Sequence, residues 1–512
     1  MILRRSVCSL FALGLALAPA TTVVAAPLDA NAGNWRMVVL TGPTQIVVPM
    51  PSQVGGADYQ AELAAIKSAQ VSITAGQQRA VQYWSRGGVL RWNEIMLGLV
   101  ARYNLPPAPL DNGTYPVPDS NNPFADPNFP FANPPYAARA YSYVAVAQAD
   151  ALKAAWYYKF LYNRPSPARV DNGVRQLVPA TDLPAYPSED AVVSGVTAEL
   201  LKLLFPASIE EITMKAAEQR QAALLSGKAT ASDLAAGLAL GQAVAAAFTA
   251  RAGNDGMRTA GGNPVLWQAL ADGAVVRGEI PWKSQDIPPR PPMLPAFGSV
   301  RAWAMTPEDI VRERPASPPS TSSALMEHEV ADVRRYVDHS TRWELAVVNF
   351  WADGAGTPTP PGHWNFIAAP FVQQADMSEV RAARAFALLN MALHDAAVAC
   401  WEVKFFYFNP RPSQMDPELK TLIGMPNFPS YTSGHSTFSG AAAEVLSYLF
   451  PNGAAEFEVM KEEASISRLY AGIHYRSDVE LGKAHGERVG GYTVSFAMTD
   501  GAGPPIEASV AP

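Results

Sequence analysis

The sequence predicts an all-α protein built from two tandem helical bundles that arose by internal duplication. Three observations predict this fold class. Apolar residues recur with helical spacing over long segments, hardly any stretch alternates as a strand would, and distinctive residues repeat at a constant distance along the chain. With 512 residues, of which 48% are hydrophobic, the chain is long enough for one large or two ordinary domains with a substantial core.

Helical spacing is found in both halves of the chain. The segments are 58–70, 75–103, 137–161, 189–205, 208–226 and 230–250, then 324–350, 377–406, 434–450, 453–467 and 477–498. Residues 37–49 alternate in the manner of a strand. The connections are rich in proline and glycine and span 104–136, 252–306, 313–323 and 353–376. Because loops this long in a compact protein are disordered or functional, we expect their aromatic residues to pack as a cover over a site.

The two halves match at a constant distance of 245 residues. The matched positions carry residue types that seldom align by chance: Arg139 with Arg384, Asp150 with Asp395, Trp156 with Trp401, Lys159 with Lys404, Ser188 with Ser433, and Asp233 with Asp478. Earlier in the chain, Arg91-Trp92 resembles Arg342-Trp343 at a distance of 251 residues. This pattern predicts an ancestral duplication of one helical unit.

The N-terminus has the features of a secretory signal peptide at residues 1–25. Arg4-Arg5 form a charged start, residues 10–18 a short apolar stretch, and Ala25/Ala26 a cleavage site preceded by small residues. The paired arginines also occur in twin-arginine export signals, but the residues after them fit that signal poorly and favour an ordinary Sec signal. A secreted or periplasmic location is expected in either case.

Composition excludes several classes of function. The formal charge of −7 gives no general attraction to nucleic acid or anionic lipid, so an anion site must be built locally from a few converging cations. Cys400 is the one cysteine after the signal, which excludes an intramolecular disulfide. The most apolar later window, 234–248, contains Gln242 and is shorter than the ~20 apolar residues of a membrane helix. We therefore expect no membrane span.

Cationic side chains, histidines and a flexible glycine gather in the C-terminal half. They are Lys404 and Arg411 in KFFYFNPRP, Ser433, Gly434 and His435 in FPSYTSGHSTFSG, and Arg468 and His474 in SRLYAGIHYRSD. Arginine donates in a planar fork and lysine as a point charge, so together they can cover the oxygens of a compact tetrahedral oxyanion. Ser433 is expected to cap the helix that follows, whose free N–H groups and positive dipole favour an anion. Gly434 lets the backbone approach that anion.

The pattern Lys-x6-Arg-Pro, Ser-Gly-His, Ser-Arg-x5-His-x3-Asp resembles the type 2 phosphatidic acid phosphatase (PAP2) and vanadium-dependent haloperoxidase superfamily. The resemblance implies that the equatorial oxygens of vanadate or phosphate are held by Lys404, Arg411, Ser433, Gly434 and Arg468. His474 is implied as the axial nitrogen ligand of vanadate or as the phosphohistidine nucleophile of a phosphatase. His435 is implied as the acid–base group. Asp478 is expected to accept the other ring N–H of His474, with a solvated helix-start charge as the alternative.

Two aromatic residues favour the peroxidase branch. Trp401 and Phe428 resemble the halide-side aromatics of fungal-type vanadium chloroperoxidases, whereas bromoperoxidases tend to carry His at the Phe428 position. Trp401 also has a packing explanation, because the first half keeps Trp156. Residues 350–368 and 428–446 resemble bacterial haloperoxidases with a large duplicated chain.

The sequence therefore predicts a secreted enzyme that uses vanadate, hydrogen peroxide, a halide and a small organic acceptor. One alternative is a secreted acid phosphatase that hydrolyses phosphate esters through a phosphohistidine. Another is a phosphate- or vanadate-binding protein without turnover, although oxyanion binding alone requires neither His435 nor His474.

The first half has lost these residues, since Gly434, His435, Arg468 and His474 correspond to Glu189, Asp190, Ala223 and Ala229. The predicted organisation is a signal peptide (1–25), a degenerate helical repeat (26–252), a Pro/Gly-rich connecting region (253–323), a catalytic helical domain (324–500) and a flexible tail (501–512). Neighbouring residues on a helix point to different faces, so His394-Asp395 is not expected to form a catalytic dyad. His363 follows a Pro-Gly turn and is a candidate for the site entrance.

Overall fold

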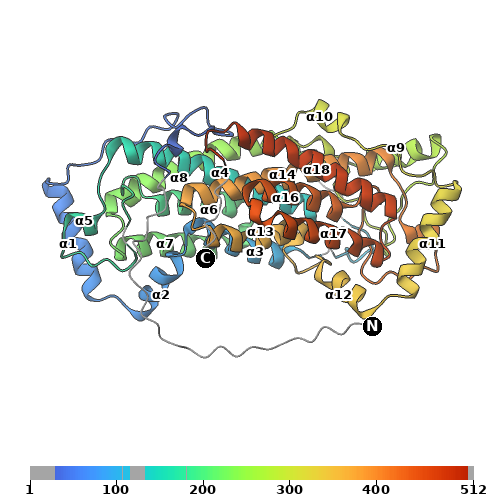
Figure 1. The fold of residues 1–512 in the computed structure, drawn as a ribbon, viewed down its shortest axis with the longest axis horizontal. Coiled ribbons are helices and arrows are strands. Elements are labelled where there is room, and N and C mark those ends of the chain that lie inside the picture. Colours follow the sequence, from blue (N-terminus) through green and yellow to red (C-terminus); the bar gives the residue numbers. More distant parts are fainter. Residues whose placement is uncertain (1–28, 106–107, 116–132, 180, 505–512) are drawn as a thin grey trace.

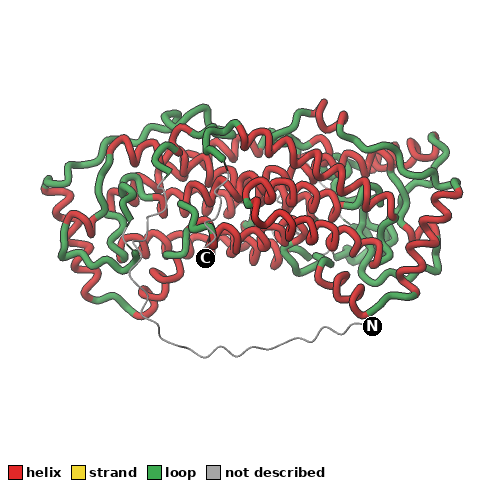
Figure 2. The backbone as a smooth tube through the Cα atoms, in the orientation of Figure 1, coloured by secondary structure: helices red, strands yellow, loops and turns green. Residues whose placement is uncertain are grey.

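The computed structural model describes residues 29–105, 108–115, 133–179 and 181–504. Within these residues the protein is helical and contains no strand (Figures 1 and 2). The all-α fold class is therefore confirmed. The predicted signal peptide with its cleavage site, and all but the first residues of the predicted tail, lie outside the described residues.

The helices fall into two series joined by the connecting region. The first series is α1 (Ala57–Val71), α2 (Ala75–Trp84), α3 (Gly88–Tyr103), α4 (Pro134–Tyr162), α5 (Pro167–Val170), α6 (Glu189–Leu204), α7 (Ile209–Leu225) and α8 (Ala231–Ala252). The connecting region contributes α9 (Pro264–Val276) and α10 (Pro307–Arg312). The second series is α11 (Ala324–Asp338), α12 (Arg342–Phe350), α13 (Thr359–Gln374), α14 (Glu379–Tyr407), α15 (Pro412–Met415), α16 (Gly434–Leu449), α17 (Ala454–Tyr470) and α18 (Arg476–Met498).

The two series repeat with the predicted spacing. α4 and α14 are both 29 residues long and begin 245 residues apart, at Pro134 and Glu379. α6 and α16 are both 16 residues long and begin at Glu189 and Gly434. Figure 1 shows the two bundles end to end, with α1 and α11 at opposite ends and α4, α6, α14 and α16 between them. α4 packs along α14, so the two longest helices join the bundles.

α12 repeats α2 and not α3, which corrects the predicted match of Arg91-Trp92 with Arg342-Trp343. The same hydrogen bond anchors the ends of α2 and α12, from Trp84 Nε1 to Glu218 at 3.1 Å and from Trp351 Nε1 to Glu463 at 2.9 Å. The two glutamates are 245 residues apart, whereas the two tryptophans are 267 apart. The connections between repeated helices thus differ in length in the two bundles. A local match of Arg-Trp therefore cannot show that α12 is equivalent to α2, which their packing shows.

Residues 359–374 were predicted as loop and form the helix α13, which packs against α3, α4, α14 and α16. Backbone N–H groups in the first turn of a helix have no carbonyl acceptor within the helix. Proline has no N–H group, so prolines are tolerated in the first turn of α13. Pro370 lies inside the helix, and burial of the helix compensates for the hydrogen bond it removes. Trp364, for example, is fully buried and donates to Ser439 at 3.0 Å. Tertiary packing outweighs the local signal here.

Residues 37–49 form no strand, contrary to the alternation of their apolar residues. Three consecutive backbone N–H groups of this segment instead donate to the buried carboxylate of Asp150 on α4, at 2.8–3.1 Å. In the second bundle Trp303 and Ala304 donate in the same way to Asp395 on α14, at 2.7 and 2.8 Å. Both repeats therefore use a carboxylate on the central helix to hold a segment of irregular chain.

The helix pairs α6–α8 and α16–α18 touch backbone to backbone. A Cβ added at Gly486 of α18 would lie 2.1 Å from the carbonyl oxygen of Thr437, and one at Gly241 of α8 would lie 2.5 Å from that of Val192. Glycine alone permits this approach. In the second bundle the approach sets the first turn of α18 against the N-terminus of α16.

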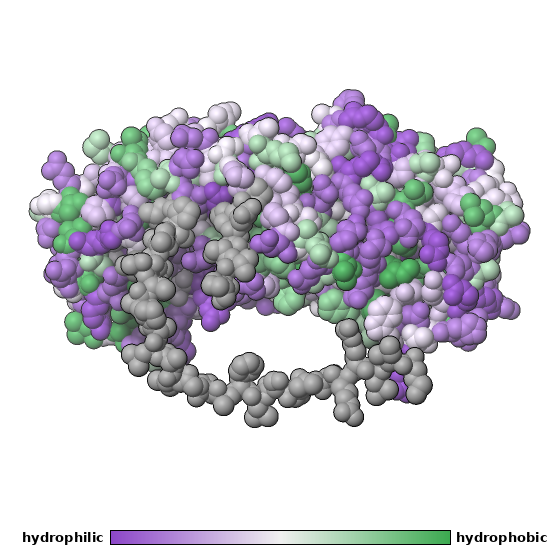
Figure 3. Space-filling view, viewed as in Figure 1, coloured by the Kyte–Doolittle hydropathy of each residue, from purple (hydrophilic) through white to green (hydrophobic). Residues whose placement is uncertain are grey.

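α8 has 22 residues and is long and apolar enough to cross a membrane by length and composition, which corrects the expectation that this stretch is too short. Those two properties alone do not distinguish a membrane span from a core helix. α8 lies against α6 through Gly237 and Gly241. On the face drawn in Figure 3, hydrophobic residues form small areas scattered among hydrophilic ones.

Candidate active site

The N-terminus of α16 forms the floor of the site. Ser433 is its N-cap, as predicted: its hydroxyl accepts the N–H of Ser436 at 3.3 Å, and it can still donate its own proton. The Ser433 N–H donates to the carbonyl of Asp478 at 3.0 Å, which ties α16 to the first turn of α18. Gly434 opens the helix, and its N–H is one of the free donors of a helix start.

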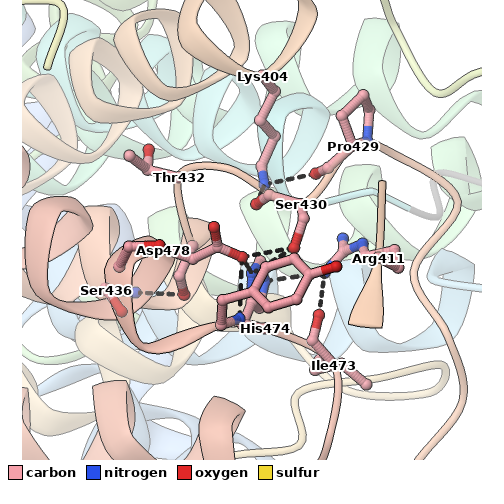
Figure 4. Close-up of polar contacts among 12 residues, drawn as sticks. Lys404, Arg411, Pro429, Ser430, Thr432, Ser436, Ile473, His474 and Asp478 are labelled. Atoms are coloured by element: carbon pink, nitrogen blue, oxygen red, sulfur yellow. Dashed lines mark hydrogen bonds and ion pairs between the residues drawn. The ribbon is translucent and has the colours of Figure 1, made fainter. Parts of the chain in front are cut away.

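Lys404 and Arg411 are fully buried and are held by backbone carbonyls (Figure 4). Lys404, in the last turn of α14, donates to the carbonyls of Pro429 and Ser430 at 2.8 and 2.7 Å. Arg411 Nε donates to the carbonyl of Phe428 at 2.9 Å, and its Nη1 donates to that of Ile473 at 2.7 Å. Burial lowers the pKa of Lys404 to about 7 and that of Arg411 to about 10. Burial thus disfavours the charged form of both side chains, because water cannot stabilise it there, and an anion in the site would favour it.

His474 lies between Asp478 and Arg411 (Figure 4). Its Nδ1 is 2.8 Å from Asp478 Oδ2, and its Nε2 is 3.0 Å from Arg411 Nη1. Burial, and then the charge of Arg411, hold the pKa of His474 well below its usual range, so the ring is neutral. A neutral ring that donates from Nδ1 to a carboxylate carries its lone pair on Nε2. The geometry therefore leaves Nε2 as a ligand or nucleophile.

Asp478 is bound to His474 as expected and also caps α18, but it is fully buried and not the solvated charge of the alternative. It accepts the N–H of Tyr475 at 3.2 Å, which caps α18, and it also accepts from His474. Ser430 donates its hydroxyl to the same carboxylate oxygen. Burial raises the pKa of Asp478 to about 6, and donation by Ser430 opposes that rise.

Arg468 and His435 face the site from α17 and α16. Arg468 is buried, and its Nε donates to Ser467 Oγ at 3.0 Å. Burial lowers its pKa to about 10. His435 Nε2 lies 3.5 Å from a carboxylate oxygen of Asp353, in the loop between α12 and α13. Burial, and then Arg468, lower the pKa of His435 to about 4, although Asp353 opposes the shift.

The donor set fits a tetrahedral oxyanion such as vanadate or phosphate. The contacts of Lys404, Arg411 and Arg468 within the described chain are to carbonyls, a hydroxyl and a ring nitrogen, and none is a carboxylate. Arg411 Nη2 is buried and has no hydrogen-bond partner. Buried cations and orphaned donors are costly unless an anion compensates them. The described part of the chain contains no cluster of three or more His, Cys, Asp or Glu side chains that could hold a metal cation.

A cavity of about 450 Å³ opens onto the anion site. Gly434, His435, Arg468 and His474 line it on the polar side. Trp401 and Phe428 line it on the apolar side, with ring centroids 4.9 Å apart. The Phe428 ring lies 5.0 Å from both Lys404 Nζ and Arg411 Cζ, so it is the aromatic surface nearest the charges. The structure thus brings all the predicted site residues together.

The connecting region lines the cavity, but not through its aromatic residues, which the sequence led us to expect as the cover. Met293 and Arg290 line it, and Trp401 Nε1 donates to the carbonyl of Met293 at 3.1 Å. The first bundle also reaches the cavity through Asn104, whose side-chain amide donates to the carbonyls of Gly354 and Thr357 at 2.9 and 3.0 Å. One cavity in the second bundle is therefore walled by three parts of the chain.

The part of the chain that contains these site residues matches a family of known proteins. Residues 384–500 match the family model described as the PAP2 superfamily. They form a PAP2-superfamily domain. This PAP2 domain contains every predicted site residue, from Trp401 and Lys404 to Asp478, whereas Asp353 and the connecting region lie outside it.

The chain is also similar to one curated protein and to two solved structures. Vanadium chloroperoxidase of Curvularia inaequalis is 33% identical over 135 residues, which cover 20% of this chain and 22% of the relative. The chain thus spans about a fifth of the length of the curated relative it matches. The first bacterial vanadium-dependent iodoperoxidase to be solved has a TM-score of 0.55 at 22% identity, over 71% of this chain and 91% of that one. A holo bacterial vanadium-dependent chloroperoxidase has a TM-score of 0.50 at 16% identity, over 76% and 97%. Both structures share the fold.

The first bundle supplies its own carboxylates where the PAP2 domain leaves cations unpaired. Lys159, the counterpart of Lys404, lies 2.7 Å from Glu189. Lys228 lies 3.1 Å from Glu189 and 2.6 Å from Asp190. Charge attraction from Lys159 and Lys228 outweighs the effect of burial and holds the pKa of Glu189 well below its usual range. This copy is neutralised internally, which excludes a second oxyanion site.

Three residues of the site were missed by sequence reasoning: Ser430, Asp353 and Asn104. Ser430 lies within the FPSYTSGH run, but nothing in its spacing indicates a bond to Asp478. Asp353 and Asn104 lie outside the PAP2 domain and act through loops. His394-Asp395 is not a catalytic pair, since His394 bonds the carbonyl of Arg301 at 3.3 Å and Asp395 holds the Trp303 loop.

Proposed function

We propose that this protein is a secreted vanadate-dependent haloperoxidase. The reaction is X⁻ + H₂O₂ + H⁺ → HOX + H₂O, in which the halide loses two electrons to the peroxide and the hypohalite then reacts with a small organic acceptor. One observation supports it above the others: three buried basic side chains, none hydrogen-bonded to a carboxylate, lie close enough to His474 to lower its pKa, beside an aromatic wall. The relatives named as vanadium-dependent give independent support.

The residues have separable roles in this proposal. Lys404, Arg411 and Arg468 would hold the oxyanion together with the Ser433 hydroxyl and the Gly434 N–H, and His474 Nε2 would be its nitrogen ligand. Bound vanadate would supply the activation of hydrogen peroxide toward the halide. The fixed cations polarise the oxygens at which charge develops, and they need no reorganisation because backbone carbonyls already hold them.

His435 is proposed as the group that moves protons at the anion. It lines the cavity and lies at the start of α16, next to Gly434. Asp478 fixes the tautomer of His474 through Nδ1, so that the lone pair of Nε2 stays directed at the site. Ser430 and the Tyr475 N–H in turn fix Asp478.

Phe428 is proposed to select the halide. A halide must shed water before it reacts, and an apolar wall lowers the amount of competing solvent. We expect Phe428→His to lower chloride turnover more than bromide turnover, because a polar ring beside Lys404 and Arg411 would bring water to the site. Vanadate affinity should change little, since Arg411 is bound by the Phe428 carbonyl, which the substitution keeps.

The measurement for Phe428 is the ratio of kcat/KM for chloride to that for bromide. Leu183 occupies the equivalent position in the first bundle, so Leu183→His is the matched control and should leave the ratio as it is. An unchanged ratio in Phe428→His, or a wild type that oxidises iodide alone, would show that Phe428 packs the loop and selects nothing.

A PAP2-type acid phosphatase is the second candidate. It is favoured by the neutral Nε2 of His474, which is placed as a nucleophile for phosphorus, with His435 available to protonate the leaving oxygen. A binding protein without turnover has less support, because a cavity and two histidines accompany the cations.

A paired assay separates these functions. Purified apoprotein is given orthovanadate, hydrogen peroxide and iodide, bromide or chloride, and a parallel sample is given a phosphate ester without vanadate. We expect peroxide-dependent halide oxidation that requires vanadate and is inhibited competitively by phosphate, because both anions fit one site. Ester hydrolysis without any vanadate-dependent oxidation would assign the protein to the phosphatases.

The proposed location is secreted or periplasmic. This proposal rests on residues 1–25 alone. N-terminal sequencing of the exported protein tests it. We expect the mature chain to begin near Ala26.

A further inference from the structure

Asp353 is shared by two histidines. His363 Nδ1 lies 3.1 and 3.2 Å from its two carboxylate oxygens, and His435 Nε2 lies 3.5 Å from one of them. Burial alone would raise the pKa of Asp353, but the hydrogen bond from His363 and the nearby His435 ring outweigh it and hold that pKa well below its usual range. The carboxylate is therefore charged and lies between two imidazoles.

The His363 ring is held in a fixed plane. It stacks on Trp351, with ring centroids 4.4 Å apart and planes 26° apart, and it meets the edge of Phe350 at 5.0 Å. His363 itself lies in the first turns of α13, whose packing against the central helices is described above. A ring fixed in this way can hold Asp353 in one rotamer.

The backbone around Asp353 is held from the other side, by the first bundle. Asn104 donates to Gly354 and Thr357, and its own carbonyl accepts the Gly356 N–H at 2.7 Å. These bonds fix the loop but do not touch the Asp353 carboxylate. The contacts that orient the carboxylate within the described chain come from the two histidines, and of these His363 is the one held by aromatic rings, stacked on Trp351 and edge-to-face with Phe350.

The position of Asp353 matters to His435 because the positive charge of Arg468 acts on that ring. The neutral ring of His474 is also near His435, and Tyr141 from α4 lies near Asp353 with its hydroxyl on the Pro358 carbonyl. Burial and Arg468 disfavour a proton on His435, whereas the Asp353 charge and a hydrogen bond to the Trp351 carbonyl favour it. A displaced Asp353 would leave His435 without this partner.

We propose that His363 is a positioning residue of the active site, which holds the Asp353 carboxylate against His435 and thereby keeps His435 oriented and protonatable. The kinetic part of this inference rests on the proposed function, and the spectroscopic part does not. The rival explanation is that the His363–Asp353 pair only anchors the start of α13 to the preceding loop.

Two substitutions at His363 separate these explanations. His363→Phe keeps an aromatic ring between Trp351 and Phe350 but removes the donor to Asp353. His363→Asn removes the ring but places an amide N–H near the position of Nδ1. Positioning predicts that the Asn variant is the more active of the two, whereas a packing role predicts that the Phe variant is.

The primary readout uses the apoprotein labelled with ¹⁵N-histidine, with the His435 signals assigned from a His435→Gln sample. In His363→Phe we expect the titration of His435 to move to lower pH and its tautomer signals to change. Asp353→Asn should produce the same change, and His363→Asn should stay close to wild type. Phosphate affinity, measured by calorimetry, should be the same in wild type and both His363 variants, because Lys404, Arg411 and Arg468 are untouched. Asp353→Asn is left out of this comparison, since the Asp353 charge also acts on Arg468.

In the vanadate-loaded enzyme we expect His363→Phe to lower kcat by about 10–100-fold, the range found when a residue behind a catalytic group is removed. The KM for halide should change little. A His435 titration identical in wild type and His363→Phe would overturn the inference, as would an Asn variant less active than the Phe variant. If wild type oxidises no halide and the His435 signals still move, the proposed function fails and the positioning role stands. Should His363→Phe not fold, Asp353→Asn carries the spectroscopic test alone.

Discussion

Lys404→Met should abolish turnover with little loss of stability, whereas Lys159→Met should destabilise the protein and leave turnover nearly intact. The two lysines occupy equivalent positions 245 residues apart, and both are fully buried. They differ in their partners. Lys159 lies 2.7 Å from Glu189, while Lys404 bonds two backbone carbonyls and faces the anion site.

The physical reason lies in what each substitution leaves behind. Removal of Lys159 leaves Glu189 buried with a weakened set of partners, and breaking such a pair costs about 3–5 kcal/mol. Lys228, 3.1 Å from Glu189, compensates in part and favours the lower end of that range. Removal of Lys404 breaks no direct ion pair, although buried Asp478 loses one of the two cations that lower its pKa. It also removes a buried cation that no carboxylate contacts directly, and this gain offsets the loss of two hydrogen bonds to carbonyls.

Urea unfolding measures the stability of each variant, the shift in melting temperature with phosphate measures anion binding, and a halide-oxidation assay measures turnover. Loss of one donor to a developing oxyanion lowers kcat by about 10²–10³, and Lys404→Met should reach at least this range. Phosphate should raise the melting temperature of wild type and Lys159→Met but not of Lys404→Met, because a ligand stabilises only the state that binds it. Equal losses of turnover in both variants would show that the first bundle takes part in catalysis.

The sequence predicted the parts of the site whose residues lie close together in the chain or within one motif. His474 and Asp478 are one helical turn apart, and Ser433 directly precedes an apolar helical run, so spacing alone predicts their relation. Lys404 and Arg411 were recognised because the motif orders them. The duplication was visible because Trp, Lys and Asp kept a single distance across both central helices.

The parts that the sequence did not predict depend on contacts between distant segments. Asp353 lies 82 residues before His435, and Asn104 lies in the other bundle, so no local pattern relates either residue to the site. α13 was taken for a loop because its prolines oppose a helix locally, and burial among four helices outweighs them. Residues 37–49 alternate like a strand, but Asp150 accepts the N–H groups that a neighbouring strand would need.

His474→Ala and His435→Ala should fail in different ways, which provides the sharpest test of the two roles. His474 Nε2 is the ring nitrogen directed at the cations, and its Nδ1 is fixed by Asp478. Its loss should abolish turnover and bring vanadate affinity down to the level of phosphate affinity. Phosphate is held through its oxygens by Lys404, Arg411 and Arg468, so its binding should persist in this variant.

His435→Ala should keep the affinity for both anions, because Lys404, Arg411 and Arg468 remain and His435 Nε2 lies against Asp353. Turnover should fall by about 10²–10⁴, the contribution expected of a general acid–base group. Calorimetric titration of each apoprotein with phosphate and vanadate, followed by halide oxidation, gives both sets of values. Turnover retained in His474→Ala would overturn the assignment of that residue as ligand or nucleophile. Loss of vanadate binding in His435→Ala would mean instead that His435 turns from Asp353 to hold the anion itself.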